Sequence, residues 1–249
     1  MSQGRLAVGT SGFDYDHWQG RFYPADLTRS RRLNYYSRHF DTLEVNRTFY
    51  GLPKRETVQD WAKQVESDYV FALKFSRYGS HLKHLLDPEQ TVGNFLERVE
   101  VLGSRMGPIL VQLPPHWKAD HERLDQFLTQ AGPRAKRWAV EIRDPSWLCE
   151  DVFDVLQEHK AALVIHDMLE GHPWRLTTDW TYLRYHGNHY QGSYTHQKLT
   201  ADAGRLADLL EQGVDVYAYF NNDDQAHAVE NARQLRDYVR SALDRDTPG

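Results

Sequence analysis

The sequence predicts a single eight-stranded parallel β/α (TIM) barrel, and three observations carry this prediction. The chain has 249 residues, the usual length of one such barrel. Eight short apolar runs are spread over it, and each run ends in polar or charged residues. Helical patterns fill most of the gaps, and strands alternating with helices indicate a parallel sheet with helices outside. The runs lie at residues 6–12, 42–46, 69–76, 109–115, 138–144, 162–167, 181–187 and 215–222.

Each helix expected between the runs shows apolar residues at helical spacing. Asp87-Pro88 and Asp144-Pro145 are typical of helix starts, with the aspartate as N-cap and the proline at the first position. Gly213 is a favoured residue after a helix end. The predicted stripes are Val58, Trp61, Ala62 and Val65; Val92, Phe95, Leu96, Val99 and Leu102; Val152, Val155 and Leu156; Leu206, Leu209 and Leu210; and Val229, Ala232, Leu235 and Val239.

Two connections depart from the regular alternation. Residues 168–180 carry no helical stripe, so we expect the sixth helix to be short or missing there. Residues 13–29 form a long loop rich in aromatic residues, and loops of this length are usually functional or packed down as lids. No linker-like stretch divides the chain, so residues 1–249 are expected to form one domain.

Composition excludes some classes of function. The net charge of −5 gives no overall attraction to nucleic acid or anionic membranes, although a local basic patch remains compatible with it. Cys149 is the only cysteine, so no internal disulfide is expected and a reducing compartment is the simplest location. No secretory signal pattern is visible, and no apolar run approaches the ~18 residues of a membrane span. We therefore expect a cytoplasmic protein without membrane contact.

Polar side chains near the ends of the runs predict a functional site. In a β/α barrel the active site lies at the carboxyl ends of the strands, and side chains alternate between the two faces of a strand. Charges on the interior face are costly unless they are paired or near the open mouth. A polar cup at the mouth is therefore expected, formed by Glu44, Asn46, Lys74, Gln112, Glu141, Arg143, Arg184, His186 and Asn221.

The residue types in this cup favour an anionic ligand and acid–base chemistry. Lys74, Arg143 and Arg184 are three cations, and guanidinium groups match carboxylate or phosphate. Glu141 and Glu44 are candidate proton-transfer groups if their surroundings separate their pKa values. Lys74 is the third candidate catalytic residue, with Schiff-base chemistry as a minor alternative. The candidate substrate-binding residues are Asn46, Gln112, Arg143, Arg184, His186 and Asn221.

A divalent metal site is a separate hypothesis, with Asp167 and His186 as candidate ligands beside the two glutamates. His166 and Asp167 point to opposite faces of their strand, so at most one is central, and Asp167 is the preferred one. The first run ends without the paired histidines of many metal-dependent barrel hydrolases, and no H-E-x-x-H occurs. The sequence also lacks G-x-G-x-x-G and P-loop motifs, so no nucleotide cofactor is expected.

A set of short motifs recurs from the first run to the last. They are VGTSGF at 8–13, FYP at 22–24, EVN at 44–46, TFY at 48–50, FALK at 71–74, QLPP at 112–115, EIRDPSW at 141–147, YHG at 185–187 and YFNND at 219–223. With these motifs the chain resembles domain-of-unknown-function family 72, the YecE-like proteins. The resemblance implies a barrel but no established reaction. The barrels of this family look like those of sugar isomerases and apurinic-site endonucleases, and a nucleic-acid role has been suggested from that analogy, which is a poor guide to function.

Three functional hypotheses follow. The leading one is an enzyme acting on a small polar anionic substrate, phosphorylated or carboxylated and sugar-like, and the sequence does not select among hydrolase, lyase and isomerase. The second is a nucleic-acid-binding or processing protein that uses loop aromatics and a basic rim. The third is a non-catalytic ligand-binding protein with the same cup. The basic rim of the second hypothesis consists of Arg29, Arg31, Arg32, Arg77, His81, Lys83 and His84.

Overall fold

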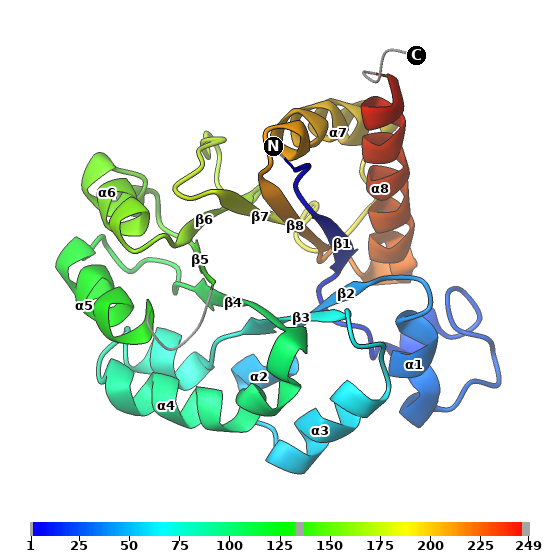
Figure 1. Cartoon of the computed structure of the whole chain (residues 1–249), viewed down its shortest axis with the longest axis horizontal. Coiled ribbons are helices and arrows are strands. Elements are labelled where there is room, and N and C mark those ends of the chain that lie inside the picture. Colours follow the sequence, from blue (N-terminus) through cyan, green and yellow to red (C-terminus); the bar gives the residue numbers. More distant parts are fainter. Residues whose placement is uncertain (1, 133–136, 246–249) are drawn as a thin grey trace.

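A computed structural model describes residues 2–132 and 137–245, and it confirms the eight-stranded parallel barrel (Figure 1). The strands surround a common centre in the order β1-β8-β7-β6-β5-β4-β3-β2, and the helices lie outside them. Each strand lies within or overlaps one of the predicted apolar runs. The strands are β1 Leu6–Thr10, β2 Thr42–Val45, β3 Val70–Lys74, β4 Met106–Gln112, β5 Trp138–Glu141, β6 Ala162–His166, β7 Trp180–Tyr185 and β8 Asp215–Phe220.

The barrel is nearly closed, and β1 and β2, the two ends of the strand order, are joined near the mouth. β1 and β2 share a single bridge between Ser11 and Glu44, and the Gly12 N–H donates to the Glu44 carbonyl at 2.8 Å. Further down, the Tyr36 hydroxyl accepts from the Thr10 N–H at 2.9 Å and fills the seam. The seam therefore brings the end of β1 directly against the end of β2, where the predicted cup begins.

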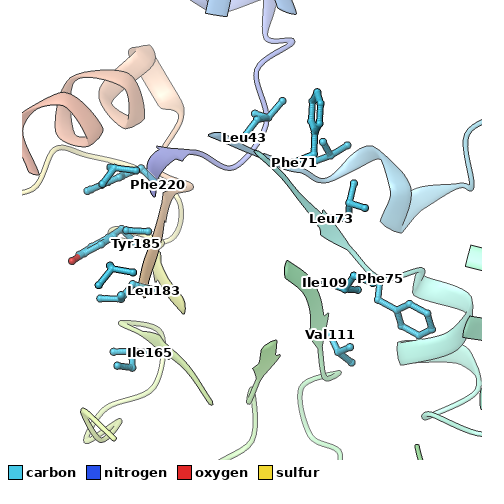
Figure 2. Close-up of a cluster of buried hydrophobic side chains, with 14 of the residues drawn as sticks. Leu43, Phe71, Leu73, Phe75, Ile109, Val111, Ile165, Leu183, Tyr185 and Phe220 are labelled. Atoms are coloured by element: carbon cyan, nitrogen blue, oxygen red, sulfur yellow. The ribbon is translucent and has the colours of Figure 1, made fainter. Parts of the chain in front are cut away.

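Side chains alternate between two apolar layers, as the strand period requires. The interior layer combines small residues of β3, β4 and β5 with tyrosines of β7 and β8, and the rings of Tyr182 and Tyr219 lie 5.1 Å apart. Large residues facing small ones fill a barrel of this size. The outer layer packs under the helices, and Figure 2 shows part of it, including Leu43, Leu73 and Val111. The faces assigned from the sequence are those observed.

The main helices are α1 Arg32–Tyr36, α2 Arg47–Tyr50, α3 Arg55–Lys63, α4 Pro88–Val99, α5 His121–Ala131, α6 Glu150–Glu158, α7 His196–Glu211 and α8 His227–Arg245. Short helical turns are η1 Asp16–Trp18, η2 Arg29–Arg31, η3 Tyr78–Leu82, η4 Glu100–Arg105, η6 Pro145–Trp147 and η7 Asp224–Ala226. Between β6 and β7 the described chain forms no helix, as expected for the missing sixth helix. None of the described helices is both long and apolar enough to cross a bilayer.

Three details of the helices differ from the prediction. Helix α5 is not among the predicted helices. Asp87 does not cap α4 with its side chain, because its backbone is left-handed (φ 50°) and its carboxylate pairs with Lys83 Nζ at 2.9 Å. Asp144 accepts from the Ser146 N–H and caps only the short turn η6, and α6 begins later, at Glu150. A proline after aspartate therefore marks a turn start, which need not continue as a helix.

The long loop after β1 is packed against the rim. Trp18 is fully buried, and its indole N–H donates to the Asp223 carbonyl in the loop after β8 at 3.1 Å. Arg32 ties the loop to α1 by donating to Asp14 and Asp16, both at 2.8 Å. Residues 13–29 thus form a fixed wall of the mouth beside β1 and β8.

Candidate functional site

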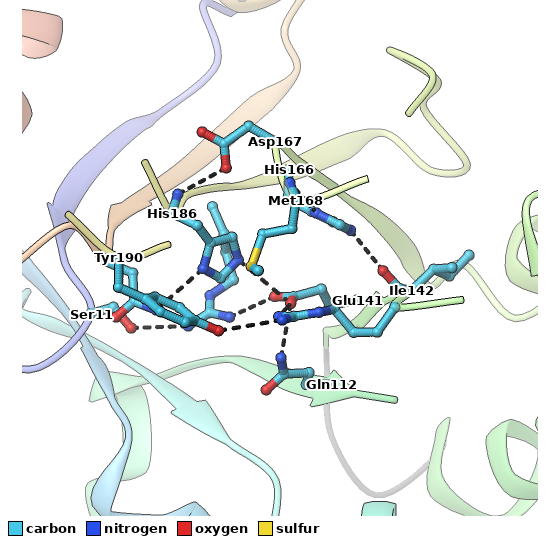
Figure 3. A network of polar contacts seen from close by, with 12 residues as sticks. Ser11, Gln112, Glu141, Ile142, His166, Asp167, Met168, His186 and Tyr190 are labelled. Carbon is cyan, nitrogen blue, oxygen red and sulfur yellow. Dashed lines mark hydrogen bonds and ion pairs between the residues drawn. The ribbon is translucent and has the colours of Figure 1, made fainter. Parts of the chain in front are cut away.

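Arg184 is the centre of a buried polar network at the mouth. Figure 3 shows the part of this network around Glu141, with Ser11, Gln112, His186 and Tyr190. It lies on β7, and its guanidinium donates to Glu141 Oε2 at 2.6 Å, to Glu44 Oε1 at 2.8 Å and to Ser11 Oγ at 3.0 Å. Only 2% of Arg184 is exposed. The two carboxylates raise the pKa of Arg184 against the effect of burial. Arg184 is therefore paired with both glutamates and is not a free anion-binding group.

Glu141 accepts hydrogen bonds from three side chains of the network. Its Oε1 accepts from Arg143 at 2.7 Å and from Gln112 Nε2 at 3.0 Å, in addition to the Arg184 bond on Oε2. Burial raises the pKa of Glu141, yet the charge of Arg184 outweighs it and the pKa is held well below its usual value. An anion held this way orients the cations that surround it and is poorly suited to donate a proton.

The carboxylate of Glu44 accepts hydrogen bonds from three neighbouring side chains. It accepts hydrogen bonds from the Ser11 hydroxyl, from Tyr182 OH at 2.6 Å and from Arg184. The residue is fully buried. Its contacts make it the floor of the cup, although the sequence analysis had it as a candidate proton-transfer group.

Lys74 differs from the other cations of the cup because it has no carboxylate partner. In the described residues no aspartate or glutamate lies within ion-pair distance of its Nζ, which sits 4.4 Å from the ring centroid of Phe49. Only 8% of Lys74 is exposed. Burial, followed by the charge of Arg184, lowers the pKa of Lys74 to about 8. The cup thus holds three cations against two carboxylates, and the unbalanced one is Lys74.

Arg143 lies higher in the mouth than Arg184. Its side chain is 12% exposed, and besides Glu141 it donates to the hydroxyl of Tyr190 at 3.3 Å. Tyr190 belongs to the loop after β7, is 40% exposed, and places its ring edge-on to His186, with centroids 5.4 Å apart. In the sequence Tyr190 is one of several loop aromatics, and such residues serve loop packing more often than substrate contact.

The two histidines of the site, His166 and His186, differ in their hydrogen-bond partners. His166 donates from Nε2 to the Ile142 carbonyl at 2.7 Å and accepts the Met168 N–H on Nδ1, so both nitrogens are used. His186 is buried, and burial lowers its pKa. Asn221 Nδ2 lies 3.3 Å from His186 Nδ1, which assigns the ring proton to Nε2. That Nε2 makes no hydrogen bond and lies 3.5 Å from Glu141 Oε1. The Nε2–H of His186 is thus a buried donor that faces Glu141 without a hydrogen bond in the described structure.

Asn46 and Ser11 complete the wall on the β1–β2 side. Ser11 Oγ gives its proton to Glu44 and accepts from Arg184 and from Asn46 Nδ2, the latter at 2.8 Å. Ser11 is a network residue that the sequence analysis missed. Its position two residues after Gly9, on the interior face of β1, is the signal that would have found it.

The metal hypothesis does not match the geometry of the described residues. Glu44 and Glu141 both bond to Arg184, and Asp167 points away from the cup, accepting from the His186 backbone N–H at 2.9 Å and from the Tyr194 hydroxyl. No group of three or more His, Cys, Asp or Glu side chains in the described chain is placed to hold a metal ion. The preference for Asp167 over His166 was wrong about position, because His166 is the one that faces the interior.

Three of the seven residues of the basic rim are ion-paired. Arg29 and Arg32 pair with Asp14, and Lys83 pairs with Asp87. The rim residues come from two separate segments, after β1 and after β3. The geometry therefore gives the nucleic-acid hypothesis no support of its own.

Fold and site together define a β/α-barrel protein whose strand ends converge on a polar cup with surplus positive charge. The family model described as "Protein of unknown function DUF72" matches residues 7–248, so the chain belongs to this family. The resemblance expected from the sequence motifs is thereby confirmed.

Two curated relatives, both described as UPF0759 proteins, are similar to this chain. UPF0759 protein YecE of Escherichia coli K12 is 34% identical over 119 residues, which are 47% of this chain and 43% of that protein. The aligned part thus spans less than half of YecE. UPF0759 protein YunF of Bacillus subtilis is 23% identical over 276 residues, covering 92% of this chain and 93% of the relative.

Solved structures agree on the fold. A DUF72 family protein from Thermotoga maritima superposes with a TM-score of 0.84 at 28% identity, covering 95% of this chain and 99% of the other. A second one, from Enterococcus faecalis, has a TM-score of 0.75 at 20% identity, with 96% and 99% covered. A D-psicose 3-epimerase reaches 0.56 at 11% identity, with 98% and 99% covered, which shows a shared barrel only.

Proposed function

We propose that this chain is an enzyme that acts on a small anionic metabolite, phosphorylated or carboxylated, at the mouth of the barrel. One observation carries the proposal: Lys74 is a buried cation without a carboxylate partner, in a cup where the other two cations are already paired. A buried charge is costly unless a counter-charge accompanies it. An anion from the ligand would supply that counter-charge.

The remaining cup residues would position such a ligand. Arg143 reaches the mouth with one side of its guanidinium held by Glu141, which leaves further N–H groups to donate to the same anion. Tyr190 would give up its bond to Arg143 when the anion arrives. His186 Nε2–H and the amides of Asn46 and Asn221 would bind hydroxyl or carbonyl oxygens.

Proton transfer falls to Lys74 in this scheme. The pKa of about 8 applies to the free protein; an anion bound beside Lys74 favours its ammonium form, which can donate a proton to the ligand and take it back. Glu141 and Glu44 then serve as positioning residues, because their carboxylates are occupied by Arg184. The proposed place of action is the cytoplasm, where the unpaired Cys149 stays reduced.

The test measures binding of inorganic phosphate and citrate by isothermal titration calorimetry. Lys74→Met should weaken binding at least tenfold, because a charge-assisted contact contributes about 1.5–3 kcal/mol. Lys63→Met is the control, since Lys63 is exposed on α3 and pairs only with Asp60. Equal binding by wild type and Lys74→Met would refute the anion site.

Turnover separates an enzyme from a binding protein that uses the same cup. Incubation with a panel of phosphorylated and carboxylated sugars, followed by NMR of the products, should show conversion that Lys74→Met abolishes. Tight binding without conversion of any panel member would favour the non-catalytic alternative.

A further inference from the structure

A hollow opens at the rim of the cup, between the loop after β1 and the segment after β2. Its volume is about 350 Å³, within the range of roughly 300–1,000 Å³ for small-ligand pockets. Its lining includes four aromatic residues, one amide, one guanidinium and the carboxylate of Asp14, which is paired with Arg29 and Arg32. The six aromatic, amide and guanidinium residues, which we call the rim hollow, are Phe13, Tyr15, Tyr50, Trp61, Asn46 and Arg47.

The rim hollow borders the cup at Asn46, which lines the hollow and donates to Ser11 of the cup. The β2–β3 register ends with Val45 opposite Leu73, and the next residues on the two segments are Asn46 and Lys74. The hydroxyl of Thr48 donates to the Lys74 carbonyl at 2.7 Å and holds the two segments together. A ligand whose anion lies at Lys74 would therefore extend past Asn46 into the hollow.

Asn46 presents a hydrogen-bond acceptor that no protein group satisfies. Ser11 Oγ has a single proton, which it donates to Glu44, so the atom of Asn46 that faces it must be the amide nitrogen. This fixes the orientation of the amide and turns Oδ1 away from Ser11. Oδ1 is buried and has no partner in the described structure. Buried acceptors of this kind require a donor, and a ligand hydroxyl is one.

The other walls match the remaining groups of a sugar. Tyr50 is 79% exposed, and rings such as Tyr50 and Trp61 offer apolar faces on which the C–H side of a sugar ring packs. Arg47 is exposed, and its side chain makes no hydrogen bond or ion pair within residues 2–132 and 137–245, so its guanidinium can donate to ring hydroxyls. Acceptor, donor and apolar wall lie together beside a cation.

We infer that the rim hollow is the subsite for the ring of a sugar phosphate or sugar acid, whose anionic group lies at Lys74 and Arg143. This inference rests on the anion site of the proposed function and names the substrate class for it. Asn46 Oδ1 accepts from a ring hydroxyl, Arg47 donates to another, and Tyr50 covers the ring.

Calorimetry with four kinds of probe tests the subsite: inorganic phosphate, hexose and pentose monophosphates, hexuronic acids, and the free sugars. At least one sugar phosphate or sugar acid should bind wild type tenfold tighter than inorganic phosphate. Comparison of the phosphate and acid arms identifies the anion. Free sugars should bind weakly, because they lack the anionic group.

Variants test whether the tighter binding of sugar derivatives, relative to inorganic phosphate, arises from the rim hollow. Tyr50→Ala, at an exposed site that does not endanger folding, should reduce the advantage over inorganic phosphate to about threefold or less and leave phosphate binding itself unchanged. Asn46→Ala should weaken the best sugar ligand at least tenfold. Asn94→Ala, exposed on α4, is the control and should change neither.

The outcomes distinguish the two proposals. Phosphate binding that depends on Lys74, with no sugar derivative binding better than phosphate, would overturn the subsite and leave the anion site standing. An unchanged advantage in both Tyr50→Ala and Asn46→Ala would overturn it as well. Loss of the Lys74 dependence itself would contradict the proposed function.

Discussion

Lys74 and Glu141 show how neighbouring groups of one cup acquire opposite properties. Both are buried, and burial disfavours the charged form of each. Glu141 receives two guanidinium groups, and its pKa falls well below the usual value. Lys74 receives no carboxylate, and its pKa falls to about 8. At neutral pH the first is fixed as an anion, and the second titrates near the working range.

The depressed pKa of Lys74 makes stability depend on pH. Below about pH 8 the amine is charged in both folded and unfolded chains, so the cost of its burial is fully present. Between about 8 and 10.5 the unfolded chain binds more protons, so the free energy of unfolding rises with pH. Over this window the gain approaches about 3 kcal/mol.

Lys74→Met removes this contribution, so the variant should gain stability over wild type at neutral pH and lose that advantage near pH 10. Urea unfolding of both proteins at several pH values measures the difference. Curves that stay parallel across the window would show that Lys74 has an ordinary pKa.

At the scale of the elements, the β1–β2 seam leaves no room for a side chain at Gly9. Gly9 lies so close to β2 that a Cβ there would meet the Thr42 carbonyl oxygen at 2.5 Å and Tyr36 OH at 3.1 Å. The strand backbone must shift to admit a side chain, and overpacking of this kind costs about 1–3 kcal/mol.

Gly9→Ala should therefore lower the free energy of unfolding by this amount. Gly51→Ala serves as control, because Gly51 has an extended backbone (φ −171°) and no atom within 4 Å of the added Cβ. Urea titrations compare the two variants, and a Gly9→Ala protein as stable as Gly51→Ala would mean that the seam is looser than described.

The strands were predictable because each is buried on both faces, which leaves short continuous apolar runs that end at the mouth. The starts of the helices were less predictable than the strands. Asp144-Pro145 has the composition of a helix start, yet buried Trp147 ends the turn and α6 starts five residues after the proline. Local composition reports a turn, whereas the length of the helix after it depends on packing.

On the scale of the whole molecule, the polar network ties together two parts of the barrel that pair weakly. The β5–β6 ladder has two aligned pairs, Ala139 with Ala162 and Val140 with Leu163, and β1–β2 has the single Ser11–Glu44 bridge. Arg184 on β7 bonds to β2 through Glu44 and to β5 through Glu141, so it spans both seams.

Arg184→Met should destabilise the protein by about 3–5 kcal/mol, because two buried carboxylates lose their cation. Arg175→Met breaks an exposed pair with Glu150 and should cost less than about 1 kcal/mol. Hydrogen exchange should rise more at the Gly12 amide, which crosses the β1–β2 seam, than at the Asn221 amide, which joins β8 to β7. A uniform rise at both amides would argue against a role specific to the seam.

The sequence by itself determined the barrel, the mouth and most of the residues that face it, because these follow from apolar runs, side-chain alternation and helical spacing within short segments. Only the tertiary structure decided which charges pair. Arg184 meets glutamates that lie 43 and 140 residues away along the chain, whereas Lys74 meets none. Ion pairing depends on distances across the barrel, and these distances exist only after the ring of strands has formed.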